Sequence, residues 1–236
     1  MLWNGQRVVL DMAIHALAHP LVTRFRPALV LGALREDVWY VPLVGAVLDR
    51  PSLTHFYPPG LPGGLVPLLT PGPRWRTDRL FARAVERYRA GRPAAAFVQL
   101  GRAVHLLTDM ACPVHAQRTV HMISDSFEWY VEGHAGALES LPVPAVAARR
   151  RASELVEDLA RQTQRFPSDT TNSPWGRVLW RVGLRRKIPL PVLSDHARQL
   201  IPLAAGYAAA LLQLFLLRAA GEVTVGAVPA LEAPAP

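Results

Sequence analysis

Hydrophobic residues recur every three to four positions along most of the chain, and proline, glycine or polar clusters interrupt the pattern. This spacing places apolar side chains on one face of a helix. The expected elements are all helices. Six of them cover residues 5–19, 23–34, 75–90, 144–165, 175–187 and 200–217; another carries His105 and Asp109 and should kink or end at Cys112, and a further one begins in the segment 125–134.

Two stretches lack this helical period. Residues 49–74 are dense in proline and glycine, so we expect a long loop. Residues 222–236 are proline-rich without any period and are expected to be a disordered tail. Half of the 236 residues are hydrophobic, which is enough for one core, so we expect a single domain over residues 1–221.

The segment FVQLGRAVHLLTDMACPVHA carries the chemistry that is easiest to recognise. His105 and Asp109 are four residues apart in a helical run, so both side chains leave the same face of one helix. Pro113 should end that helix and turn His115 onto a different approach, and Glu128 follows on the next helix. A lone histidine on an apolar helix is commonly a hydrogen-bonded core residue. Imidazoles clustered with carboxylates are instead the ligand set of a divalent metal such as zinc.

This segment resembles the signature of the bacterial zinc-dependent phospholipases C, with Gly101, His105, Asp109, Pro113 and His115 in place. The resemblance implies an all-α, single-domain, multi-helix bundle with three zinc ions in one cleft. It also implies hydrolysis of the phosphodiester between diacylglycerol and the head group, with a phospholipid or a membrane surface as substrate. Fungal zinc nucleases share the fold, so a nuclease acting on nucleic acid, or another phosphodiesterase, is an alternative.

The resemblance assigns a first metal site to four residues from separate segments. Asp37 matches a zinc-ligating aspartate after the second helix, and His55 matches a histidine that precedes an aromatic residue. His105 and Asp109 complete this site of two imidazoles and two carboxylates. Asp37 and Asp109 are the expected catalytic carboxylates, with Asp109 bridging two metals.

A second site is implied at His115 and Glu128, together with another histidine. The family places that histidine four residues before the glutamate, where this chain has Ser124. His121 can take this place from a loop but not from a continuous helix, because seven residues of helix span about 10 Å. His134 is the other candidate.

The family's third zinc uses the amino group and carbonyl of an N-terminal tryptophan and an early histidine. Here Gln6 stands at the matching histidine position and Trp3 is not the first residue. We therefore expect two zinc ions, or three if this site forms. A catalytically degenerate, metal-stabilised helical protein is a further alternative.

Charge and cysteine content add little to this interpretation. The formal net charge of +8 favours an anionic partner, either a lipid surface or a nucleic acid. The single cysteine, Cys112, excludes a disulfide within the chain and is expected to be buried.

The hydrophobic runs bear on location. Arg7, Asp11 and His15 interrupt the first apolar run, so no secretory signal is expected, and a cytoplasmic or membrane-peripheral location is favoured. Residues 175–187 can form an arginine-faced helix that either docks on a membrane or covers the core. Residues 200–217 are expected to be a buried helix rather than a membrane span.

Overall fold

A computed structural model describes residues 1–36, 54–57, 63–64, 66, 69–118, 125–169, 188–219 and 221, with the backbone of strands 38–41 and 46–49. Two of the predicted site residues, Asp37 and His121, lie outside the described residues, as do the predicted helix 175–187 and the tail 222–236. The described elements, in chain order, are α1 (Trp3–Leu17), α2 (Pro20–Arg24), α3 (Arg26–Arg35), β1 (Val38–Val41), β2 (Ala46–Asp49), α4 (Pro73–Arg89), α5 (Pro93–Thr108), η1 (Asp109–Ala111), α6 (Pro113–Ala116), α7 (Ser126–Leu138), α8 (Ala152–Thr163) and α10 (Leu190–Ala219).

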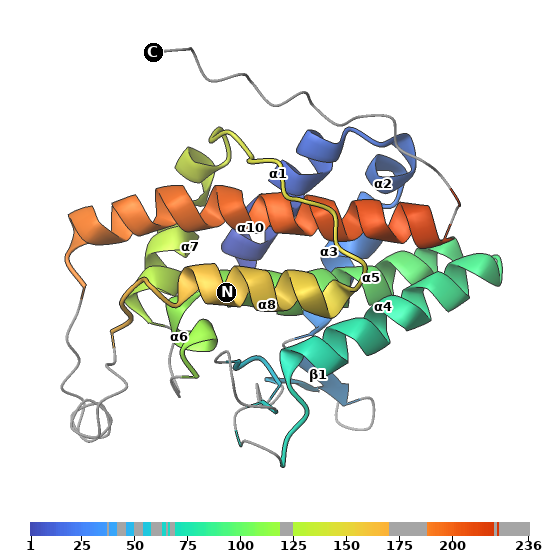
Figure 1. Cartoon of the computed structure of the whole chain (residues 1–236), viewed down its shortest axis with the longest axis horizontal. Coiled ribbons are helices and arrows are strands. Elements are labelled where there is room, and N and C mark those ends of the chain that lie inside the picture. Colours follow the sequence, from blue (N-terminus) through green and yellow to red (C-terminus); the bar gives the residue numbers. More distant parts are fainter. Residues whose placement is uncertain are drawn as a thin grey trace.

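The fold is an all-α bundle assembled around α10, which confirms the predicted fold class. In Figure 1, α10 runs along the length of the molecule, with α8 beside it. It contacts α1, α4, α5, α7 and α8. Its apolar residues are buried almost throughout, and Phe215 packs edge-on against Phe97 of α5 with ring centroids 5.3 Å apart.

Two glycines bring α3 and α5 into backbone contact. A Cβ atom added to Gly101 would lie 2.0 Å from the carbonyl oxygen of Leu29, and one added to Gly32 would lie 2.1 Å from that of Val98. Real Cβ atoms do not approach other atoms so closely, so glycine is needed on each helix at this crossing. The crossing fixes the position of α5 relative to α3, whose end leads to Asp37.

The break after the metal-ligand helix lies where the sequence predicts it. The α-helical part of α5 ends at Thr108, a 3-10 turn follows, and Cys112 adopts an extended conformation before Pro113 begins α6. Proline disfavours helical geometry in the residue before it, which accounts for this conformation. The chain therefore turns between Asp109 and His115.

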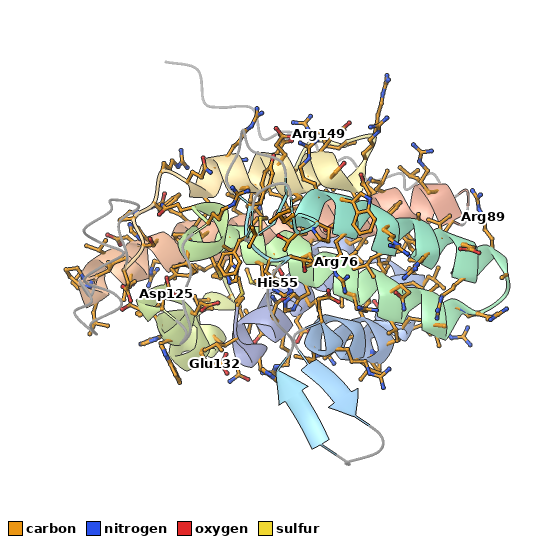
Figure 2. All side chains as sticks on the ribbon, turned by 90° about the horizontal axis from the view of Figure 1, so that it is seen from below. His55, Arg76, Arg89, Asp125, Glu132 and Arg149 are labelled. Atoms are coloured by element: carbon orange, nitrogen blue, oxygen red, sulfur yellow. The ribbon has the colours of Figure 1, made fainter. Side chains whose placement is uncertain are left out.

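Several boundaries differ from the prediction. Residues 23–34 do not form a continuous helix; α2 ends at Arg24 and α3 begins at Arg26, because Pro27 cannot continue the hydrogen-bond ladder of a preceding helix. The predicted helix 144–165 begins only at Ala152, and the residues around Pro142 and Pro144 have no regular secondary structure. A short antiparallel hairpin, β1–β2, was not expected and projects from the helices in Figure 2.

The terminal helix is longer than its apolar core suggested. It starts at Leu190 and continues through Pro202. Among the described residues it is the one helix with the length and hydropathy of a membrane span, and 78 % of its most apolar window is buried inside the protein. This burial agrees with the interpretation as a core helix.

Candidate metal centre

Five of the seven predicted metal ligands are described, and the fold brings all five together. His55 comes from the loop before α4, His105 from α5, Asp109 from η1, His115 from α6 and Glu128 from α7. Each is at most 4 % exposed. Figure 2 shows His55 near the middle of the helical bundle. Burying five ionisable groups without partners would be costly, so they must satisfy one another or share a cation.

The first cluster consists of His55, His105 and Asp109. The Oδ2 atom of Asp109 lies 2.8 Å from Nδ1 of His55 and 3.3 Å from Nε2 of His105. One ligand atom from each residue lies within 4.8 Å of those of the other two. Asp37, the fourth predicted ligand of this site, lies outside the described residues.

The second cluster joins His115 and Glu128, with 3.4 Å between Nε2 and Oε1. Cys112 belongs to the same group, with its Sγ within 4.8 Å of a ligand atom of each. The loop of the first cluster also supports His115: Phe56 stacks on its ring at 4.9 Å, and the Tyr57 amide donates to its carbonyl oxygen at 2.9 Å.

Glu128 is held in place by the start of its own helix. Asp125 caps α7, because its Oδ1 accepts a hydrogen bond from the Glu128 amide at 2.9 Å. In return, the Asp125 amide donates to Oε2 of Glu128 at 3.4 Å. This reciprocal capping box leaves Oε1 directed at His115. The sequence DSFE contains the capping-box pattern, although its role in positioning a ligand is visible only in the fold.

The amino group of Met1 lies between the two clusters. It is 2.8 Å from Oδ1 of Asp109 and 2.9 Å from Oε1 of Glu128, and it is fully buried. Gln6 donates from Nε2 to the same Asp109 oxygen at 3.1 Å and accepts a hydrogen bond from Thr108 at 2.8 Å. Gln6 therefore occupies the region where the resemblance places the early histidine. The amino group at this point belongs to Met1, and Trp3 is 56 % exposed.

Electrostatics favours the protonation states that bind metal. Burial alone would raise the pKa of Asp109, but the Met1 ammonium, His105 and His115 hold it well below its usual value. Burial lowers the pKa of His115 despite the nearby carboxylates. An ionised carboxylate and a neutral imidazole are the forms that coordinate a cation. By contrast, burial raises the pKa of the Cys112 thiol well above its usual value.

The residues present fit a divalent transition metal. The two clusters offer three imidazoles and two carboxylates, and a positively charged group already sits between the carboxylates of Asp109 and Glu128. The ammonium occupies a place suited to a cation, and nitrogen and oxygen ligands of these kinds suit zinc.

Sequence reasoning missed several members of the site and offered one wrong substitute. Cys112 was expected only to pack in the core. The capping-box pattern DSFE is a sequence signal for Asp125, whereas the position of Met1 had no such signal. His134, the alternative to His121, is exposed and bonds to the carbonyl oxygen of Tyr130 at 2.8 Å. It is therefore not part of either cluster.

Comparisons with known proteins agree with this architecture. No protein-family model matches the sequence, and no curated protein sequence matches it. The fold is similar to the crystal structure of Clostridium perfringens alpha-toxin from avian strain SWCP, with a TM-score of 0.62 and 13 % identity over 94 % of this chain. It is also similar to the alpha toxin from Clostridium absonum, with a TM-score of 0.61 and 16 % identity over 92 % of this chain. The chain spans 65 % of the length of either toxin structure. It therefore has the all-α fold of these alpha-toxins, which is the zinc-dependent phospholipase C-like fold that its sequence resembles.

Proposed function

We propose that this protein is a zinc-dependent phosphodiester hydrolase of the phospholipase C type, acting on phospholipid head groups. The observation that carries the proposal is the presence of two buried ligand clusters, His55–His105–Asp109 and His115–Glu128, whose carboxylates Asp109 and Glu128 both contact one positively charged amino group. The likeness to the alpha-toxins supports it at the level of fold.

Asp109 is suited to bridge two metal sites. Its Oδ2 faces the imidazoles of His55 and His105, whereas its Oδ1 faces the Met1 amino group and Gln6. The two oxygens of one rigid carboxylate are thus directed at different neighbours. In this proposal His55, His105 and Asp109, with Asp37, would hold the first zinc.

The second zinc would be held by His115 and Glu128, with His121 as its expected third protein ligand. When bound, zinc polarises a phosphoryl oxygen and lowers the pKa of a coordinated water to about 7. The chain's own contribution is to hold the carboxylates ionised and the imidazoles oriented, because each is buried among fixed partners.

The surroundings of the cluster supply features that suit a lipid substrate. A cavity of about 530 Å³ is lined by Tyr57, Arg74 and Trp75, among others, and Tyr57 connects it to His115 through its amide hydrogen bond. Trp129 stands next to Glu128 in α7 and is 59 % exposed. Exposed tryptophans are favoured where one side of a surface contacts an apolar phase. Single-stranded nucleic acid can also stack on such rings, so substrate class needs a direct test.

Metal content provides the first test. Elemental analysis of the purified protein should find zinc, and removal by a chelator should lower the melting temperature, because a bound metal stabilises only the folded state. His105→Ala should lose zinc, whereas His15→Ala, which removes an exposed histidine of α1, should retain it. Equal zinc content in the two variants would contradict the assignment.

Hydrolysis distinguishes the candidate activities. The zinc-loaded protein should release phosphocholine from phosphatidylcholine vesicles, and His105→Ala should abolish this activity while His15→Ala preserves it. Cleavage of single-stranded DNA without lipid hydrolysis would favour the nuclease alternative. Zinc binding without either activity would identify a metal-stabilised helical protein and refute the enzymatic proposal.

A further inference from the structure

Four arginines line a second cavity, which lies on α4 and α5 outside the metal clusters. Arg76, Arg79 and Arg83 of α4 are three and four residues apart, so they share one helix face, and Arg102 of α5 lies opposite them. Leu80 is the remaining described residue that lines the cavity, whose volume is about 200 Å³. We refer to this cavity as the arginine pocket.

A buried glutamate fixes the two inner arginines. Glu36, 1 % exposed, accepts a hydrogen bond from Nε of Arg76 at 2.5 Å and from Nε of Arg102 at 2.7 Å. Both guanidinium groups form ion pairs with this one carboxylate. The arginine side chains are only 18 % and 21 % exposed. Their guanidinium groups are therefore held in place before any ligand arrives.

The two outer arginines are more exposed and add uncompensated charge. Arg79 lies over the ring of Trp75, with its guanidinium carbon 5.0 Å from the ring centroid. Within the described part of the chain, no ion pair joins Arg79 or Arg83 to an acid, and Asp78 of the same helix is engaged by the Ser153 amide instead. Counted over the described residues, four guanidinium groups and one carboxylate leave an excess of three positive charges at the pocket.

We propose that the arginine pocket binds a phosphate-class oxyanion, either the phosphate of an anionic lipid head group or free phosphate. Guanidinium groups match the oxygens of phosphate with paired hydrogen bonds, and two of the four are preorganised by Glu36. The pocket is smaller than the 300–1,000 Å³ or so of a typical organic-ligand site, which suits a single anionic group. The excess positive charge supplies the attraction.

The pocket lies close to the candidate metal centre along the chain. Arg102 and His105 are three residues apart on α5, which is slightly less than one helical turn. An anionic lipid held here would keep the protein on the surface that contains its substrate. The anion site does not depend on zinc, so this proposal goes beyond the proposed function and can be tested independently of it.

Phosphate binding by the whole protein tests the site. Calorimetric titration with inorganic phosphate at low salt should give saturable binding. The double variant Arg79→Gln/Arg83→Gln, which leaves the Glu36 contacts intact, should weaken it about tenfold or more, since each charge-assisted hydrogen bond contributes substantially. Arg87→Gln/Arg92→Gln removes the same charge from exposed positions outside the pocket and should bind as the parent does.

Two further arms separate the metal centre and the source of the phosphate. The His105→Ala variant should keep its affinity for phosphate. If His105→Ala instead loses phosphate binding while Arg79→Gln/Arg83→Gln keeps it, the anion binds at the metal centre and the proposal is overturned. Flotation with phosphatidylcholine vesicles that contain phosphatidic acid tests the lipid source. A lipid phosphate is the ligand if Arg79→Gln/Arg83→Gln fails to bind these vesicles while the parent and Arg87→Gln/Arg92→Gln bind them. Free phosphate is the ligand if phosphate binding depends on the pocket arginines but the protein does not bind these vesicles. Equal phosphate affinity in Arg79→Gln/Arg83→Gln and Arg87→Gln/Arg92→Gln would also overturn the proposal.

Discussion

Replacing Gly101 with alanine tests whether backbone contact between α3 and α5 holds the metal-ligand helix in place. The new Cβ would lie 2.0 Å from the Leu29 carbonyl oxygen and needs at least 3.0 Å, so the two backbones must separate by about 1 Å. Alanine gains about 1 kcal/mol of helix propensity over glycine. Overpacking costs about 3 kcal/mol when backbone has to move, so Gly101→Ala should lose about 2 kcal/mol of unfolding free energy.

Gly133→Ala is the matched control for this prediction. Gly133 also lies inside a helix, α7, but nothing stands within 4 Å of its added Cβ. The same substitution should therefore raise the unfolding free energy by about 0.5–1 kcal/mol. Urea unfolding followed by far-ultraviolet circular dichroism measures both variants. Stabilisation by Gly101→Ala, or equal effects of the two changes, would refute the contact argument.

The remaining predictions concern the ion-pair network, a histidine and the core. Glu36→Gln should lower the unfolding free energy by about 3 kcal/mol, because it leaves the Arg76 and Arg102 guanidinium groups without their shared carboxylate. A loss below about 1 kcal/mol, measured by urea unfolding, would contradict this prediction. Burial lowers the pKa of His196 although Asp195 opposes the shift, so the folded state binds fewer protons and stability should fall as pH drops from about 7 through the lowered pKa. His196→Gln should flatten that dependence, measured as melting temperature against pH, and an unchanged slope would exclude this histidine as its source. Phe97→Ala should cost about 3–5 kcal/mol through the cavity left at a fully buried ring, and urea unfolding within 1 kcal/mol of the parent would contradict this.

The part of the site that could be predicted is the part encoded locally. His105 and Asp109 share a helix face through their spacing, and Pro113 enforces the turn that redirects His115. These features depend on neighbouring residues, so a single sequence contains them. The helical class follows for the same reason, because the apolar period marks one face of each helix.

The missed features depend on contacts between distant segments. Met1 reaches Asp109 across 108 positions, and Cys112 joins Glu128 only because the fold brings the start of α7 to His115. The start of α8 was placed too early for a related reason. Residues 144–151 have an acceptable helical composition, but Pro144 packs in an irregular segment against α10, where its carbonyl oxygen would lie 2.5 Å from a Cβ added to Gly206.

The placement of α10 has a consequence for how the protein is made. This helix comes after the other described helices in the chain, yet it packs against α1 as well as α4, α5, α7 and α8. During synthesis, the earlier helices leave the ribosome with their apolar faces uncovered until residues 190–219 have followed. The bundle therefore cannot close progressively from its first residue, and the growing chain passes through a stage in which association with other chains competes with folding.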